Sequence, residues 1–155
     1  MGNLKIIVFP MLVLAMAMAM AISVLPYPWA VAVSEDTLFI NYHIHVVNDL
    51  PLFHSPPDVP QFYLHCKSGD RDIGDKAMLK GEDYSWDTKV NLFRTTLFFC
   101  NARWINYKWI RFDAFKASRD EKRCGEYHNS CMWSVRSNGI YFSNNNATWT
   151  NEYPW

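Results

Sequence analysis

The stretch FYLHCKSGDRDIGDK, residues 62–76, contains the features that decide the fold. Its first six residues alternate large apolar side chains with more polar ones, and this period of two is typical of a β-strand with one buried face. The residues that follow are rich in Gly, Asp and Ser, which favour turns. We therefore expect a strand that carries Cys66 into the core, followed by an exposed polar turn from Ser68 to Asp75.

The same alternation recurs along the rest of the chain. It is found in TLFINYHIHVVNDL (37–50), DYSWDTKV (83–90), TTLFFC (95–100), KWIRFDAF (108–115) and, around the hairpin signal Asn138-Gly139, in MWSVRSNGIYFS (132–143). No stretch of a dozen residues has a helical apolar stripe, and the charged segment 116–131 is expected to be a surface excursion. The pattern predicts an all-β protein, a small antiparallel β-sandwich of about seven to nine strands.

The first 32 residues have the layout of a secretory signal peptide. A short polar head with one lysine precedes an apolar run from Ile6 to Leu25, and small residues at 30–32 supply a cleavage site before Val33. The run is about twenty residues long, which leaves a retained signal anchor as the alternative. We expect cleavage, a single domain over 33–155, a secreted, extracellular protein, and no stable membrane insertion afterwards. With 15 basic and 15 acidic residues the chain is neutral, so nothing in its charge indicates nucleic-acid binding.

All four cysteines lie behind the expected signal peptide, which predicts two disulfides in an oxidising compartment. A structural zinc site would need closely spaced cysteine pairs, which the sequence lacks. Three pairings are possible and the sequence cannot choose between them. The pairing of Cys66 with Cys131 and Cys100 with Cys124 is preferred because it would join early strands to late ones.

The residues that could carry metal or catalytic chemistry do not form a recognisable site. The aspartates of 70–81 miss the ligand positions of an EF-hand loop, because Gly74 and Gly81 stand where oxygen ligands are needed. His43 and His45 share one strand face and could meet His65, but a polar solvent-facing surface is the favoured interpretation. We expect no catalytic residue, no metal site and no cofactor.

One modification signal lies near the C-terminus. Asn146-Ala147-Thr148 is an acceptor sequence for N-glycosylation, expected to be exposed close to the last hairpin. The sequence predicts a glycan on Asn146 in a secreted protein.

An ordered set of motifs gives the chain a family resemblance. The set consists of HCKS (65–68), GDRDIG (69–74), GEDYSW (81–86), NLFRTTLFFC (91–100), Trp104, RFDAF (111–115), RD (119–120), Cys124, CMW (131–133) and NGIY (138–141). In these motifs the chain resembles the plant self-incompatibility protein family, the S-protein homologues, whose founding members act in poppy pollen rejection.

The resemblance implies a secreted β-sandwich with two disulfides, no enzymatic activity and no cofactor. It also implies a signalling ligand that a cell-surface receptor protein recognises in reproduction or development. The chain departs from the pattern at Arg94, where glycine is expected in N-x-F-G-x-T, and in the Pro-rich segment 51–60.

A rigid sandwich presents specificity in its loops, so we looked there for the partner-binding residues. The segments 49–60, 68–76 and 116–130 are the candidates. Within the second, the predicted partner-binding residues are Ser68, Asp70, Arg71, Asp72 and Asp75. The alternative function is a secreted defence or carbohydrate-binding module that uses Trp149, Tyr153 and Trp155.

Overall fold

The structure is a computed structural model that describes residues 40–52, 56–104 and 108–155. The chain divides into two compact units, 1–34 and 35–155, and all described residues belong to the second. The expected signal peptide, its cleavage site and the first residues of the predicted strand 37–50 lie outside the described residues.

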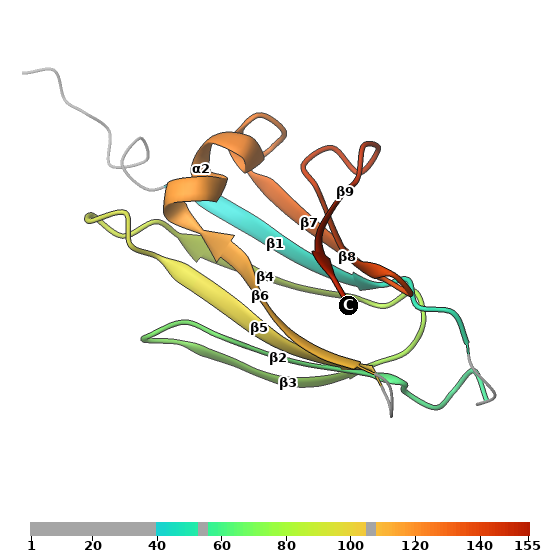
Figure 1. Ribbon diagram of the computed structural model, residues 1–155. Helices are drawn as coiled ribbons and strands as arrows, with labels where there is room; N and C mark the ends of the chain where they lie inside the picture. The colour runs from blue at the N-terminus through green and yellow to red at the C-terminus, as the bar shows by residue number, and fades with distance from the viewer. Residues whose placement is uncertain (1–39, 53–55, 105–107) are drawn as a thin grey trace, which may run out of the picture. The chain divides into compact units, whose positions relative to one another are not determined.

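The described residues form two β-sheets that pack face to face (Figure 1). One sheet has five strands in the order β4 (Asp83–Lys89), β1 (Asn41–Asn48), β7 (Ser130–Arg136), β8 (Gly139–Ser143) and β9 (Thr150–Pro154). The other has four, in the order β3 (Asp72–Met78), β2 (Phe62–Lys67), β5 (Leu97–Trp104) and β6 (Lys108–Lys116). All pairings are antiparallel except β1 with β7. The predicted all-β sandwich is confirmed.

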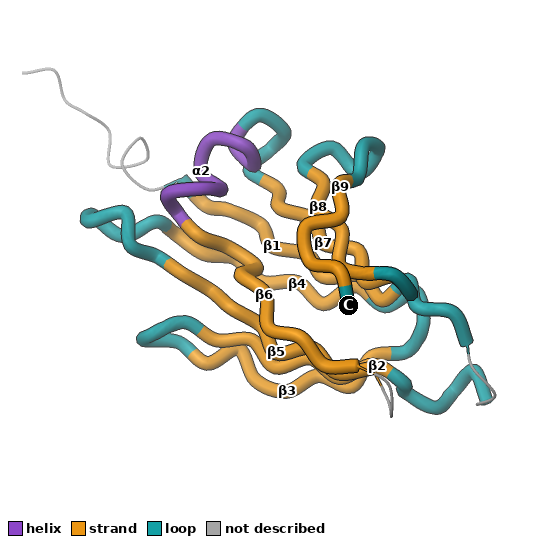
Figure 2. The backbone as a smooth tube through the Cα atoms, viewed as in Figure 1, coloured by secondary structure: helices purple, strands orange, loops and turns teal. Residues whose placement is uncertain are grey.

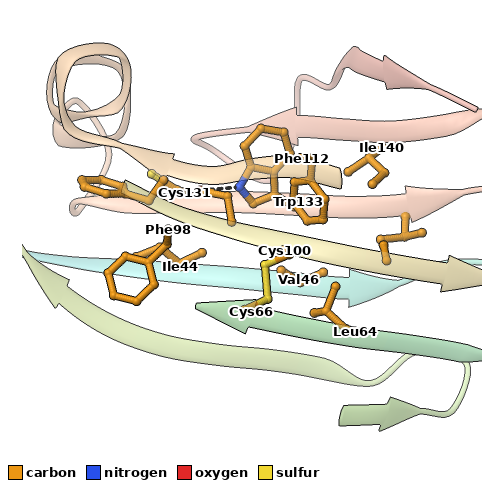
Figure 3. Close-up of a cluster of buried hydrophobic side chains, with 14 of the residues drawn as sticks. Ile44, Val46, Leu64, Cys66, Phe98, Cys100, Phe112, Cys131, Trp133 and Ile140 are labelled. Atoms are coloured by element: carbon orange, nitrogen blue, oxygen red, sulfur yellow. Dashed lines mark hydrogen bonds between the residues drawn. A yellow bond between two sulfur atoms is a disulfide. The ribbon is translucent and has the colours of Figure 1, made fainter. Parts of the chain in front are cut away.

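The core lies between the sheets and is built from alternate residues of each strand. In β1, for example, Ile44 and Val46 point inward and His43 and His45 point outward. Figure 3 shows Ile44 and Val46 of one sheet in the same buried cluster as Leu64 and the disulfide-linked Cys66 and Cys100 of the other. The period of two in the sequence therefore marks the buried face correctly.

Trp133 occupies the centre of the aromatic part of this core. Its ring is fully buried and lies 5.3 Å from Phe112 and 5.1 Å from Phe142 between ring centroids. Its indole N–H donates to the main-chain oxygen of Ala114 over 2.8 Å, the dashed line in Figure 3. A buried indole N–H needs such a partner, so this bond fixes the ring against β6.

The disulfide pairing differs from the preferred one. The structure joins Cys66 to Cys100 and Cys124 to Cys131. Cys66 and Cys100 are directly opposite on the paired strands β2 and β5, with Cα atoms 4.1 Å apart, so the sheet register itself brings the two thiols together. Cys124 and Cys131 are close because only a short turn separates the helix end from β7.

The charged segment after β6 contains a helix that the sequence did not predict, α2 (Ala117–Gly125). Its buried residues are Ala117, Asp120 and Cys124, spaced as one helical face. Because the central buried residue is a charged aspartate, the face has no apolar stripe for a pattern search to find. The expected surface excursion therefore contains a short helix, which the sequence analysis did not predict.

Asp120 connects this helix to both sheets although it is completely buried. Its carboxylate accepts hydrogen bonds from the main-chain N–H of Lys116 and from the guanidinium groups of Arg119 and Arg123. Arg119 also donates to the main-chain oxygen of Asp113 and to the Tyr153 hydroxyl, at 2.6 and 3.0 Å.

The groups around Arg119 keep its guanidinium protonated. Burial by itself lowers the pKa of Arg119, but the hydrogen bond and negative charge of Asp120, together with Tyr153, outweigh it and raise the pKa above its usual range. The guanidinium is therefore a permanent partner of the buried carboxylate.

The two disulfides should contribute unequally to stability. Replacing Cys66 and Cys100 by alanine opens the larger loop and should lower the free energy of unfolding by roughly 4 kcal/mol, against roughly 2.5 kcal/mol for the Cys124 and Cys131 pair, on chain entropy alone. Urea unfolding of the two double variants measures the difference. An equal loss in both would contradict this order.

Removing the buried charge should be costly. Asp120→Asn keeps the shape of the side chain but leaves two arginines without their carboxylate, and we expect a loss of about 3 kcal/mol in the free energy of unfolding. Asp70→Asn, an exposed aspartate, is the matched control and should change stability little. Thermal unfolding followed by circular dichroism compares them, and similar values for both variants would be the opposing result.

Candidate partner-binding site

Two connections lie beside each other at one end of the sandwich. The β2–β3 connection (68–71) and the β4–β5 connection (90–96) are the teal loops at the left of Figure 2. Together with the ends of their strands they line an open groove of about 980 Å³. Its lining includes Ser68, Asp70, Arg71, Asn91 and Thr95.

The β2–β3 connection is held by its own hydrogen bonds. The Ser68 hydroxyl donates to the Asp70 carboxylate over 2.6 Å, and the main-chain N–H of Arg71 donates to the Ser68 hydroxyl oxygen over 3.0 Å. The Arg71 guanidinium donates to the main-chain oxygen of Asp87 over 2.8 Å, which ties the loop to β4 of the other sheet. Three predicted partner-binding residues thus lie at the groove.

The other two predicted partner-binding residues, Asp72 and Asp75, do not line the groove. The predicted turn over 68–75 is too long, because the chain turns within 68–71 and β3 already begins at Asp72. Asp72 and Asp75 flank His65 of β2 on the outer face of the four-stranded sheet, with Asp75 Oδ1 2.7 Å from its Nδ1 and Asp72 Oδ1 3.1 Å from its Nε2. Residue types that usually favour turns continue into β3. Gly74 lies inside this strand with a positive φ of 101°, a conformation that glycine adopts without strain.

These two carboxylates also act on a tyrosine of the other sheet. Burial raises the pKa of Tyr84, and the negative charges of Asp72 and Asp75 raise it further. The neutral hydroxyl donates to the main-chain oxygen of Ile73 over 3.0 Å. This bond joins the edge strands β4 and β3 of the two sheets.

The β4–β5 connection presents two apolar side chains to solvent. Asn91 orders the loop, since its side chain accepts from the N–H of Thr95 and donates to the Thr95 hydroxyl, both over 2.8 Å. At the tip, Leu92 is 90 % and Phe93 82 % exposed. Sequence reasoning assigned this segment only to a motif. The signal it missed is an adjacent pair of large apolar residues between turn-forming Asn91 and Thr95.

Arg94, at the end of this tip, has a backbone conformation that is usual for glycine. Its φ is 55°, in the left-handed region that residues with a Cβ rarely adopt. Its main-chain N–H donates to the oxygen of Asn91 over 2.9 Å, which closes the turn. The side chain is largely exposed and reaches Glu121 of α2 at 3.4 Å.

The histidines considered as a metal site are separated. His43 and His45 lie on the outer face of the five-stranded sheet, and His65 lies on the outer face of the other. His43 Nδ1 is 2.7 Å from Asp87, and His45 Nδ1 is 2.8 Å from Asp83, each across the β1–β4 pair. Within the described ranges, no group of three or more His, Cys, Asp or Glu side chains could hold a metal ion.

The remaining predicted sites lie elsewhere. Asn146, the predicted glycosylation site, is exposed in the β8–β9 connection, and its glycan stays a prediction. The aromatic residues proposed for sugar binding, Trp149, Tyr153 and Trp155, are only half-exposed. Tyr153 packs against Trp133, and the Trp155 N–H donates to the main-chain oxygen of Arg136 over 2.6 Å. Tyr153 and Trp155 therefore contribute to the packing of the fold.

A comparison with known families places the chain in one of them. A family described as plant self-incompatibility protein S1 matches residues 43–155. The chain belongs to this family. Self-incompatibility protein S1 of Papaver rhoeas is 29 % identical over 87 residues, which cover 56 % of this chain and 61 % of the poppy protein.

Other members of the self-incompatibility protein S1 family are more similar. S-protein homolog 29 of Arabidopsis thaliana is 36 % identical over 94 residues, or 59 % of this chain and 65 % of that protein. S-protein homolog 6 of the same plant is 40 % identical over 78 residues, or 50 % of this chain and 54 % of that protein. The chain thus spans less than two thirds of these relatives. No solved structure matches it. In the part of the chain that the structure describes, no helix is long and apolar enough to cross a membrane.

Because Arg94 has a positive φ, we expect that replacing it by glycine makes the protein more stable. Arg94→Gly should raise the free energy of unfolding by about 0.5–1 kcal/mol, because glycine adopts this backbone without strain and an exposed ion pair contributes little. Arg94→Ala removes the same ion pair but keeps the Cβ, so it should give no gain. Urea denaturation ranks the two variants, and an alanine variant as stable as the glycine variant would refute the explanation.

Proposed function

We propose that this protein is a secreted ligand that a cell-surface protein recognises through the groove end of the sandwich, in plant reproduction or development. Family membership supports the signalling role, and the apolar leader expected at 1–32 supports secretion. Two disulfides are typical of proteins that fold in an oxidising compartment.

The observation that carries the proposal is the exposure of Leu92 and Phe93. Two adjacent large apolar side chains in water are unfavourable for the isolated protein, and a partner with an apolar pocket would remove them from solvent. Buried aromatic and apolar anchors surrounded by polar groups are the usual centre of a protein interface. Ser68, Asp70 and Arg71 at the neighbouring groove supply such a polar rim.

The loops that form this end are already ordered. The Cys66–Cys100 disulfide joins β2 and β5, the strands that enter the first loop and leave the second. Asn91 and Arg71 hold the loops themselves through the hydrogen bonds described above. Little conformational entropy would be lost on binding, which favours affinity.

The proposal assigns no catalytic residue. The four cysteine thiols, the strongest nucleophiles of the chain, are used in the two disulfides. The proposed activity is therefore recognition alone.

A loop variant tests the role of the apolar tip. The double substitution Leu92→Asp with Phe93→Asp should weaken binding to the surface of responsive plant cells at least tenfold, because it replaces the anchor by two charges. Binding of the fluorescently labelled protein, collected from the medium of cells that express the full chain, measures the change.

The matched control places one of the same charges on another loop. Ala147→Asp in the β8–β9 connection adds a charge at an exposed residue outside the three candidate loops and should bind as the parent protein does. Circular dichroism verifies that both variants are folded. Equal binding by the tip variant and the parent would place recognition elsewhere, and a protein absent from the medium would contradict the secreted role.

A further inference from the structure

The outer face of the four-stranded sheet combines arginines with aromatic rings. On this face β5 lies between β2 and the edge strand β6, and the register sets Arg103 opposite Trp109 and Asn101 opposite Arg111. On the other side of β5, Tyr63 of β2 lies opposite Arg103. All of these side chains point away from the core, since the intervening residues of each strand are buried or face inward.

The two arginines lie flat on this surface. The Arg111 guanidinium is 3.6 Å from the centroid of the Phe99 ring, and that of Arg103 is 4.8 Å from the Tyr63 ring. Cation–π contacts of this kind hold the guanidinium plane while its N–H groups stay available at the edge. Neither arginine forms an ion pair with any residue in the described part of the chain.

Trp109 adds a large flat apolar surface beside them. Its side chain is 73 % exposed, the most exposed aromatic ring on a described strand. Next to it, Tyr63, His65, Asn101 and Arg103 line a shallow depression of about 430 Å³, together with Asp75 and Lys76. The face therefore offers an aromatic platform, amide and guanidinium donors, and two arginines that form no ion pair within the described residues.

We infer that this face binds an anionic polysaccharide. The guanidinium edges of Arg103 and Arg111 match the carboxylates of uronate sugars, because two parallel N–H groups can donate to both oxygens of one carboxylate. The C–H face of a sugar ring packs on the Trp109 indole, and Asn101 reaches its hydroxyl groups.

Other anionic ligands fit this surface less well. Asp72, Asp75 and Asp113 border the positive strip and would repel a phosphate backbone that runs across the sheet. An acidic protein would need apolar pockets for its side chains, and here one indole stands alone on a flat face. A uronate chain also has apolar C–H faces that can pack on Trp109, which a phosphate backbone lacks.

This site is independent of the proposed receptor surface. It uses neither Leu92 nor Phe93, and its residues belong to strands instead of the groove loops. Failure of either proposal would leave the other standing.

Binding to polygalacturonate tests the inference. The protein expressed from the full chain should bind immobilised polygalacturonate, and added salt should weaken the interaction. Fully methyl-esterified polygalacturonan has the same sugars without the charge and should bind at least tenfold more weakly. The double variant Arg103→Gln with Arg111→Gln, and the single variant Trp109→Ala, should each lose about tenfold or more in affinity for polygalacturonate.

Matched controls separate a specific face from overall charge. Lys80→Gln with Lys122→Gln removes two exposed positive charges from other surfaces and should leave binding unchanged. Tyr127→Ala removes an exposed ring from another region and should do the same. Equal losses in control and test variants, equal binding of the neutral polymer, or binding of polyaspartate in place of polygalacturonate would each overturn the inference, as would no binding by the parent protein.

Discussion

A buried carboxylate cannot remain charged unless its partners are built around it, and Asp120 has three. The main-chain N–H of Lys116 comes from the end of β6, and the two guanidinium groups come from the helix that follows. Those arginines continue outward, Arg119 to Tyr153 and Arg123 to Glu152, both on β9. The helix therefore joins the last strand of one sheet to the last strand of the other.

Arg119 and Arg123 also pack over aromatic rings at one end of the core. The Arg123 guanidinium lies 3.6 Å from the Phe142 ring centroid, and both arginines lie over the Trp133 ring. Because Asp120 itself is fully buried, its carboxylate lies at low dielectric, where its hydrogen bonds are stronger. The Cys124–Cys131 disulfide holds the helix at its other end, so the motif residues Arg119, Asp120 and Cys124 form one structural unit.

The strands and their buried faces could be predicted from local periodicity in the sequence. The disulfide pairing could not, because it depends on the register between strands. Alternation gave the strands and their buried faces, because one side of each strand must meet the core. The disulfide pairing was wrong because Cys66 and Cys100 meet only through the β2–β5 register, which no local pattern contains. The helix was missed because its buried face centres on a charge, and Leu92 and Phe93 because exposure is a property of the folded loop.

The unfavourable features of the free protein are concentrated at one place. Arg94 keeps a backbone suited to glycine, and the two residues before it expose their apolar side chains. Neither feature stabilises the sandwich, and both lie in a loop that Asn91 and Thr95 hold in one conformation. Local violations of folding rules within an otherwise consistent structure are typical of functional sites. The stability needed to tolerate them comes from the opposite kind of region, the two disulfides and the buried network in which Asp120 has three hydrogen-bond partners.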